Sequence, residues 1–307
     1  MNTNIGMTGE FRCVVKKSDG STKIDTGYQK NLILNQGLDF FGGGNDTNMM
    51  EYCVIGSGNS KPVYTQNQLD AAITGVSGDY FSSKYDYDAS IDGNLYKTNK
   101  VRKYTFYYLN DVNISEVGLA SQFSSSIDYY LCTRALIKDS QGVPTTITVL
   151  SGEVLEIYYK LWQVFDTTDK VGTINLLDDV GGSVAYNYSS KVVTNTDESV
   201  NYFGNSARFT NRWYAIYPST DTSTPSYSSQ DAYQYSNYVD GSYKIVVTFP
   251  LGIGDANGNI RIMTIPSFSL WQIRFGSVAD DSPIVKTDMQ TLDIPVEISW
   301  GRYEGAL

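Results

Sequence analysis

Polar and apolar residues alternate along much of this chain, in short runs separated by turn-forming residues. The clearest runs are residues 155–162, 243–249, 271–275 and 294–300. Successive side chains of a β-strand point to opposite faces of a sheet, so a period of two predicts strands with one buried face. In the last run Pro295 cannot donate to a strand ladder, which predicts that this strand is an edge strand or begins there.

Glycine-containing dipeptides mark the turns between these runs. They are Asp19-Gly20, Asp92-Gly93, Gln141-Gly142 and Asp240-Gly241. Such pairs favour tight connections, and the first predicts a hairpin near the N-terminus. The best helix signal is residues 65–73, where Thr65 can cap a short helix. We therefore expect an all-β or β-dominated fold with few short helices.

The length of 307 residues accommodates one large core or two smaller ones. The strand pattern breaks at residues 166–169, and the composition then shifts toward Asn, Ser and Tyr. We therefore predict a sandwich-like domain over residues 1–165 and a second β-domain over residues 166–307. Within the second domain, residues 219–238 are rich in Tyr, Ser and Thr with almost no aliphatic side chains, which predicts an exposed loop or a contact surface.

Charge and cysteine content narrow the class of protein. A net charge of -10 argues against nucleic acid as a partner, because nucleic-acid binding needs clustered Lys and Arg. Cys13, Cys53 and Cys132 lie far apart, and their odd number predicts small buried hydrophobes in a reducing cytoplasm. No signal sequence or run of about 20 apolar residues is present. We expect a soluble protein without membrane insertion.

Catalytic and metal-binding signals are weak throughout the sequence. The chain has no histidine, which excludes Ser-His-Asp and Cys-His nucleophile systems. A glycosidase needs only two carboxylates, but no spacing selects a pair. Residues 56–61 have only the outline of a phosphate loop, and residues 255–259 resemble a calcium loop without its closing Glu. A turn is the better interpretation of residues 56–61, and a plain hairpin turn between Leu251 and Ile260 is the better interpretation of the second segment. We therefore predict no enzyme, no cofactor and no metal.

Several short phrases occur in a fixed order over residues 27–162. They are 27–33 (GYQKNLI), 36–39 (QGLD), 53–60 (CVIGSGNS) with Pro62 and Leu69, 114–120 (ISEVGLA), 134–137 (RALI) with Asp139, Gly142 and Pro144, 145–150 (TTITVL) and 152–155 (GEVL). Individually they are fold-forming features. For example, Gly118 marks a place where another backbone can approach a strand closely.

Together these phrases resemble a family of virion structural proteins of tailed bacteriophages, described as tail, tail-fibre or minor structural proteins. The resemblance implies a non-catalytic role in the tail, neck or baseplate, possibly at a fibre attachment, and brings no catalytic residues. It implies a protein that is made in the bacterial host cytoplasm and ends in the virion. The expected partners are further copies of the chain, in a homo-oligomer, and other phage structural proteins.

Aromatic side chains are the candidates for those contacts, because interface cores enrich aromatic residues. The candidate contact residues are Tyr158, Trp162, Trp213, Tyr214, Tyr227, Tyr233, Tyr235 and Tyr238. Each could equally be a core residue. The alternative function is a receptor-binding module for host-surface glycans, in which Trp213, Tyr214 and the tyrosines of residues 227–238 would form the platform.

Overall fold

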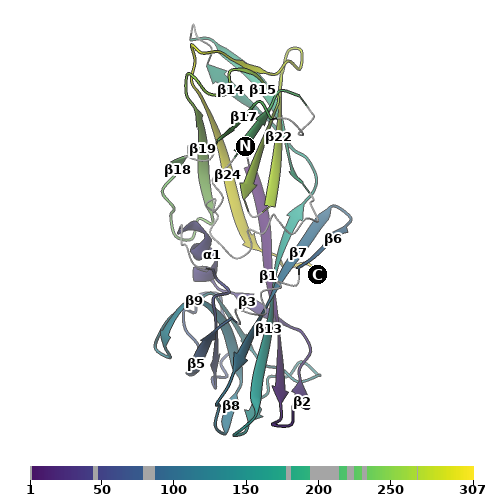
Figure 1. Cartoon of the computed structure of the whole chain (residues 1–307), viewed down its shortest axis with the longest axis vertical. Coiled ribbons are helices and arrows are strands. Elements are labelled where there is room, and N and C mark those ends of the chain that lie inside the picture. The colour runs from purple at the N-terminus through teal and green to yellow at the C-terminus, as the bar shows by residue number, and fades with distance from the viewer. Residues whose placement is uncertain are drawn as a thin grey trace.

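The computed structural model describes residues 2–43, 48–78, 87–177, 181–193, 214–219, 225–229, 234–267 and 269–307. Strands account for 59% of the chain and helix for 3%, which confirms the predicted β-dominated fold. The molecule is elongated, with a lower lobe and an upper lobe joined at a waist (Figure 1).

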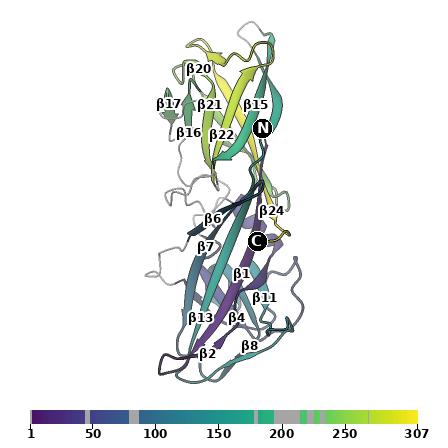
Figure 2. The same ribbon diagram turned by 90° about the vertical axis from the view of Figure 1, so that its right-hand side faces the viewer.

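Long antiparallel strands form a spine through both lobes. They are β1 (Asn2–Lys16), β13 (Val154–Asp166) and β7 (Leu95–Phe106), with β13 paired to both of the others. The predicted alternation in β13 is confirmed: Leu155, Ile157, Tyr159 and Leu161 are buried, whereas the intervening side chains are half-buried. At about 3.3 Å per residue the 15 residues of β1 span about 50 Å, which carries this strand from one lobe into the other (Figures 1 and 2).

The lower lobe packs short strands against the spine. They are β2 (Thr22–Asp25), β3 (Gln29–Ile33), β4 (Tyr52–Gly56), β5 (Ala72–Ser77), β8 (Val112–Ile114), β9 (Glu116–Ser125), β10 (Asp128–Leu131), β11 (Thr133–Leu136) and β12 (Ile147–Val149). A further strand, β6 (Tyr87–Asp92), pairs with β7 beside the waist. β1 and β2 pair antiparallel around Gly20, whose φ of 83° suits glycine, so the predicted hairpin is confirmed.

The single helix among the described residues is α1 (Asn35–Gly42), at the waist, which buries Leu38, Phe40 and Phe41. The predicted helix at residues 65–73 is wrong: a turn lies at residues 64–65 and β5 begins at Ala72. The backbone N–H groups of Leu69, Asp70 and Ala71 donate to side chains far along the chain instead of to helical carbonyls. Hydrogen bonds to side chains distant in the sequence therefore replace the helical hydrogen bonds that the local pattern predicted.

The upper lobe holds a six-stranded sheet and further strands beside it. They are β14 (Lys170–Leu177), β15 (Ser183–Val193), β16 (Tyr214–Tyr217), β17 (Tyr227–Ser229), β18 (Gln234–Tyr235), β19 (Lys244–Leu251), β20 (Gly258–Ile260), β21 (Ile262–Ser267), β22 (Ser269–Ser277) and β23 (Ile284–Lys286). The sheet order is β14-β15-β22-β21-β16-β17. Within residues 219–238 the described part contains the short strands β17 and β18, each at the end of a sheet order.

The last strand, β24 (Leu292–Arg302), returns from the upper lobe to the waist and pairs parallel with β1. It lies between β1 and β19 and begins at Leu292, so both predicted alternatives, an edge strand and a start at Pro295, are wrong. Only β19 is paired with it at Pro295, because β1 begins opposite Glu297. β13 ends at Asp166, where the domain boundary is predicted, but β24 and β19 extend the sheet of β1 and one apolar core spans both lobes.

Trp300 joins β24 to α1, and its replacement should lower the stability of the protein. Its indole N–H donates to the Leu38 carbonyl at 2.7 Å, and its ring stacks on Tyr238. Trp300→Phe keeps a ring but leaves a buried acceptor, so we expect the free energy of unfolding to fall by about 1–3 kcal/mol in urea titrations. Trp162→Phe is the matched control. Half-buried Trp162 donates to the Glu10 carboxylate, and water can replace this donor when the indole N–H is removed. Equal losses in the two variants would contradict this role of Trp300.

Candidate contact groove

Residues from several of the phrases in 27–162 meet around one hollow near the waist. Its volume is about 560 Å³, a size that suits a few side chains of a partner. Its lining residues are Met7, Thr8, Lys30, Asn31, Leu32, Ile33, Asn59, Lys61, Pro62, Arg134, Ala135, Leu136, Lys138, Gly142, Pro144, Arg302, Tyr303 and Glu304. We call this hollow the waist groove.

A buried ion pair lies at the edge of the waist groove. Glu116 on β9 and Arg134 on β11 are both fully buried, and these strands are paired. The Arg134 Nε donates to Glu116 Oε2 at 2.8 Å, and a terminal guanidinium nitrogen lies 2.7 Å from an Asp70 carboxylate oxygen. Burial opposes a charged Asp70, but hydrogen bonds from Ser60 and the charge of Arg134 lower its pKa. The guanidinium is therefore balanced by two carboxylates.

The Glu116 carboxylate also holds two loops of the lower lobe. It accepts the backbone N–H of Gly58 at 2.9 Å, of Ala71 at 2.9 Å and of Asp70 at 3.2 Å. A Cβ added at Gly58 would lie 2.4 Å from Glu116 Oε1, and one added at Gly56 would lie 2.6 Å from it. The phosphate-loop outline of residues 56–61 is thus a turn wrapped around a carboxylate of the same chain.

A second clamp fixes the opposite rim of the groove. The Gln29 side chain donates to the Lys138 carbonyl at 2.7 Å and accepts the Lys138 N–H at 2.9 Å. The loop beyond Lys138 closes on Asp139, whose carboxylate accepts the N–H groups of residues 141 and 143. Gly142 in this loop has a φ of 81°. The rim that carries Lys138 and Pro144 is therefore held in one conformation.

The groove is basic in an otherwise acidic chain. Lys30, Lys61 and Lys138 are exposed around it. Arg302 lies at one side, donating to the Ile33 carbonyl and to Asn35 Oδ1, with its guanidinium 4.0 Å from the centroid of the Tyr64 ring. Glu304 is the one acidic side chain in the lining. This contrasts with the net charge of -10 of the whole chain.

Four of the predicted contact aromatics are partly or fully buried and pack against other residues of the chain. Tyr214 is fully buried against Phe249, which removes it from any exposed contact surface or glycan platform. Tyr238 stacks on Trp300 and donates to Asp39 Oδ1 at 2.5 Å; burial and this bond raise its pKa. Tyr227 and Tyr235 are half-buried and pack on the main core.

The remaining predicted contact residues lie apart from these. Tyr158 and Trp162 are half-buried on the outer face of β13, where they hydrogen-bond to Glu156 and Glu10 respectively. Trp213 and Tyr233 lie outside the described residues. The structure therefore does not bring the eight predicted residues together in one exposed patch.

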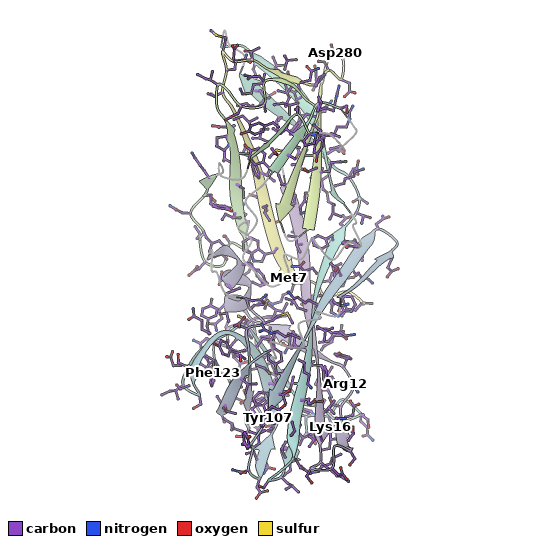
Figure 3. All side chains as sticks on the ribbon, in the orientation of Figure 1. Met7, Arg12, Lys16, Tyr107, Phe123 and Asp280 are labelled. Atoms are coloured by element: carbon purple, nitrogen blue, oxygen red, sulfur yellow. The ribbon has the colours of Figure 1, made fainter. Side chains whose placement is uncertain are left out.

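A pair of exposed tyrosines was missed by the sequence reasoning. Tyr107 is 61% exposed and Tyr108 is 92% exposed, in the loop between β7 and β8. Figure 3 shows Tyr107 in the lower lobe. Tyr108 and Asp111 both have a positive φ, which is strained for residues other than glycine. The available signal was two tyrosines between the strand run that ends at Phe106 and the Asn110-Asp111 turn.

The loop with calcium-like spacing already contains a cation of the chain itself. The buried Lys286 ammonium donates to Asn257 Oδ1 at 2.9 Å and to the Ile253 carbonyl at 3.3 Å. Burial lowers the pKa of Lys286, while the nearby charges of Asp255 and Asp288 act against that shift. Residues 251–260 are also not a simple hairpin, because β20 pairs with β23 and not with β19.

The cysteines are buried free thiols, as predicted, and burial raises the pKa of Cys13 and of Cys132 to about 12. Within the described ranges no group of three or more Cys, Asp or Glu side chains could hold a metal ion. In the same part of the chain no helix is long and apolar enough to cross a membrane.

Gly58→Ala should expose the role of the Glu116 carboxylate. The added Cβ would also lie 2.3 Å from the Asp70 Cβ, so either the loop or the ion pair has to shift. We expect the free energy of unfolding to fall by about 1–3 kcal/mol in urea titrations. Gly254→Ala is the control, because its Cβ meets nothing within 4 Å and should change stability by less than about 0.5 kcal/mol. A neutral Gly58→Ala variant would contradict the tight packing described here.

Comparison of the chain with known proteins found no matching family model, no matching curated protein and no matching solved structure.

Proposed function

We propose that this chain is a non-catalytic structural component of a tailed-phage particle, in the tail, neck or baseplate or at a fibre attachment, and that it acts through oligomeric assembly. The observation that carries the proposal is the waist groove. The phrases that resemble phage structural proteins supply most of its lining, and the buried ion pair fixes the loops around it. A rigid, partly apolar and charged groove suits a protein contact.

The use of buried charge supports an architectural role. Glu116 and Arg134 bind each other and backbone groups, and Lys286 binds a backbone carbonyl and an amide side chain. Each of these charged groups is engaged in holding loops together. An active site instead holds charged groups ready for a substrate, often with strongly shifted pKa values.

The shape of the molecule supports assembly as well. The spine of β1, β7 and β13 makes an elongated body with different features at its two ends (Figures 1 and 2). β14 and β17 end the upper sheet, and such edge strands carry backbone groups that can pair with another chain. The three free thiols fit folding in the reducing cytoplasm of a bacterial host, before incorporation into the virion.

Light scattering of the purified protein, alone and mixed with phage tail extract, tests this proposal. We expect a mass above the 34.1 kDa of one chain, or recovery of the chain with tail particles. The partners would be copies of the chain and other virion proteins, without nucleic acid. A 34.1 kDa species that joins no particle would contradict the proposal.

Binding of host-surface glycans is a second candidate function, and the Tyr107-Tyr108 loop favours it. The two rings lie 6.2 Å apart, and Ser151 donates to Asn110 and Asp111 of the same loop, which pins it. Exposed aromatic rings on a fixed loop can stack on sugar rings. A glycan array probed with the full-length protein should then give signals that Tyr108→Ala abolishes and Tyr28→Ala leaves unchanged. A blank array would remove this function and leave assembly as the only proposal.

A further inference from the structure

Three lysines of the waist groove differ from many cationic side chains elsewhere in the chain. Arg12, Lys97 and Lys244, for example, each pair with a carboxylate. Lys30, Lys61 and Lys138 make no ion pair with any residue that the structure describes, although all three are exposed around one hollow. Their positive charges are therefore available to an occupant of the groove.

Apolar surface lies between these lysines. Leu32, Ala135 and Leu136 contribute from β3 and β11, and Pro62 and Pro144 contribute from the two rims. Leu32, Pro62 and Pro144 retain exposed surface. An occupant that fits this lining carries carboxylates with at least one apolar side chain between or beside them.

One segment of the chain itself has this chemistry. Residues 287–293, which lead from β23 into the first two residues of β24, contain Asp288 and Asp293 around Met289, which is 81% exposed. Neither carboxylate makes an ion pair with a described residue. The charge of Asp288 acts on the pKa of Lys286, but the Lys286 ammonium donates its hydrogen bonds to oxygens of Ile253, Asn257 and Thr287. An exposed methionine is adaptable in contacts, because its side chain is unbranched and polarisable.

The 287–293 segment is also held in shape before any contact forms. Gln290 Oε1 accepts the Thr287 N–H at 3.2 Å, and the Gln290 N–H donates to the Thr287 carbonyl at 3.4 Å. The Met289 N–H donates to Thr287 Oγ1. This small turn forms one wall of a hollow of about 520 Å³ beside β14 and β15, and Met289 is one of the residues that line it. Such a segment therefore loses little conformational freedom when a partner binds it.

The segment cannot reach the groove of its own chain. β24 separates them: Asp293 is the second residue of this strand, and Arg302, which lines the groove, is its last residue. Nine steps of about 3.3 Å place the two ends about 30 Å apart. In Figure 1 β24 runs from the upper lobe to the waist, so the segment and the groove lie at different positions along the long axis of the molecule.

We propose that the waist groove binds the 287–293 segment of a second copy of this chain, through Lys30, Lys61 and Lys138 facing Asp288 and Asp293 with Met289 on the apolar lining. The contact is heterologous, because groove and segment are different surfaces. Repetition of one heterologous contact builds a ring or an open helical array. This inference rests on the proposed assembly function and names the surfaces that perform it.

Charge reversal in the full-length chain tests the contact by sedimentation velocity over a range of concentrations. Lys61→Glu/Lys138→Glu and, separately, Asp288→Lys/Asp293→Lys should each weaken self-association at least about tenfold. An equimolar mixture of the two variants should associate again, because each reversed groove then meets a reversed segment. Higher salt should weaken association of the wild-type chain.

Lys17→Glu/Lys191→Glu is the matched control, since both lysines are exposed and lie outside the groove lining. It changes the net charge by the same amount as Lys61→Glu/Lys138→Glu and should associate as the wild type does. Groove variants that associate normally, or a mixture that stays apart, would overturn the inference. A wild-type chain that is monomeric alone but is recovered with tail particles would also overturn it, while leaving the proposed function intact.

Discussion

The Glu116–Arg134 ion pair is the interaction on which the lower lobe depends. Removing two charges from water carries a penalty of several kcal/mol for each ion, and attraction between them offsets it only when their other hydrogen-bonding atoms are also satisfied. Here three backbone N–H groups and Arg134 share the Glu116 carboxylate, and Asp70 adds a second carboxylate to the guanidinium. The loops at residues 56–60 and 69–71 therefore follow from the position of one side chain. Because an apolar pair of similar size could be equally stable, the pair is better explained by the single loop arrangement that it imposes and hence by the shape of the groove.

The two lobes are not independent, because the first and last strands of the chain pair with each other. β24 lies parallel to β1, and its Trp300 reaches α1 through the Leu38 carbonyl. Phe165 at the end of β13 contacts Trp271 of the upper sheet, with ring centroids 6.0 Å apart. Pairing residues nearly 300 positions apart requires the closure of a long loop, which costs entropy before contacts compensate. The same pairing then fixes the distance between the waist and the upper lobe.

Local patterns in the sequence predicted strands well and predicted tertiary contacts poorly. The alternation at residues 155–162 depends only on neighbouring residues and one buried face, and β13 matches it. Residues 65–73 were misjudged because their N–H groups bind Tyr129 and Glu116, which no local rule can see. The aromatic candidates failed for a related reason: in a β-rich core half of each strand faces inward, so a tyrosine such as Tyr214 is as readily core as surface. Gly118, by contrast, was predicted to lie against another backbone, and its Cβ would meet the Thr133 carbonyl at 2.2 Å.

Charged side chains that make no ion pair within the chain indicate where a partner can bind. A pair such as Lys103–Glu156 or Lys23–Glu153 is explained within the chain, and an ammonium such as Lys286 is explained by the oxygens around it. Lys30, Lys61 and Lys138 lie around one hollow without an ion pair to a described residue and have no such explanation, and neither do Asp288 and Asp293 beside an exposed methionine. Opposite charges at the waist and in the upper lobe of an elongated body cannot meet within one chain, yet they can meet between neighbours displaced along the long axis. The length of β24, about 30 Å between the two surfaces, would then set the stagger of that assembly. A strand whose local role is to close the sheet thus also determines how copies of the chain are spaced.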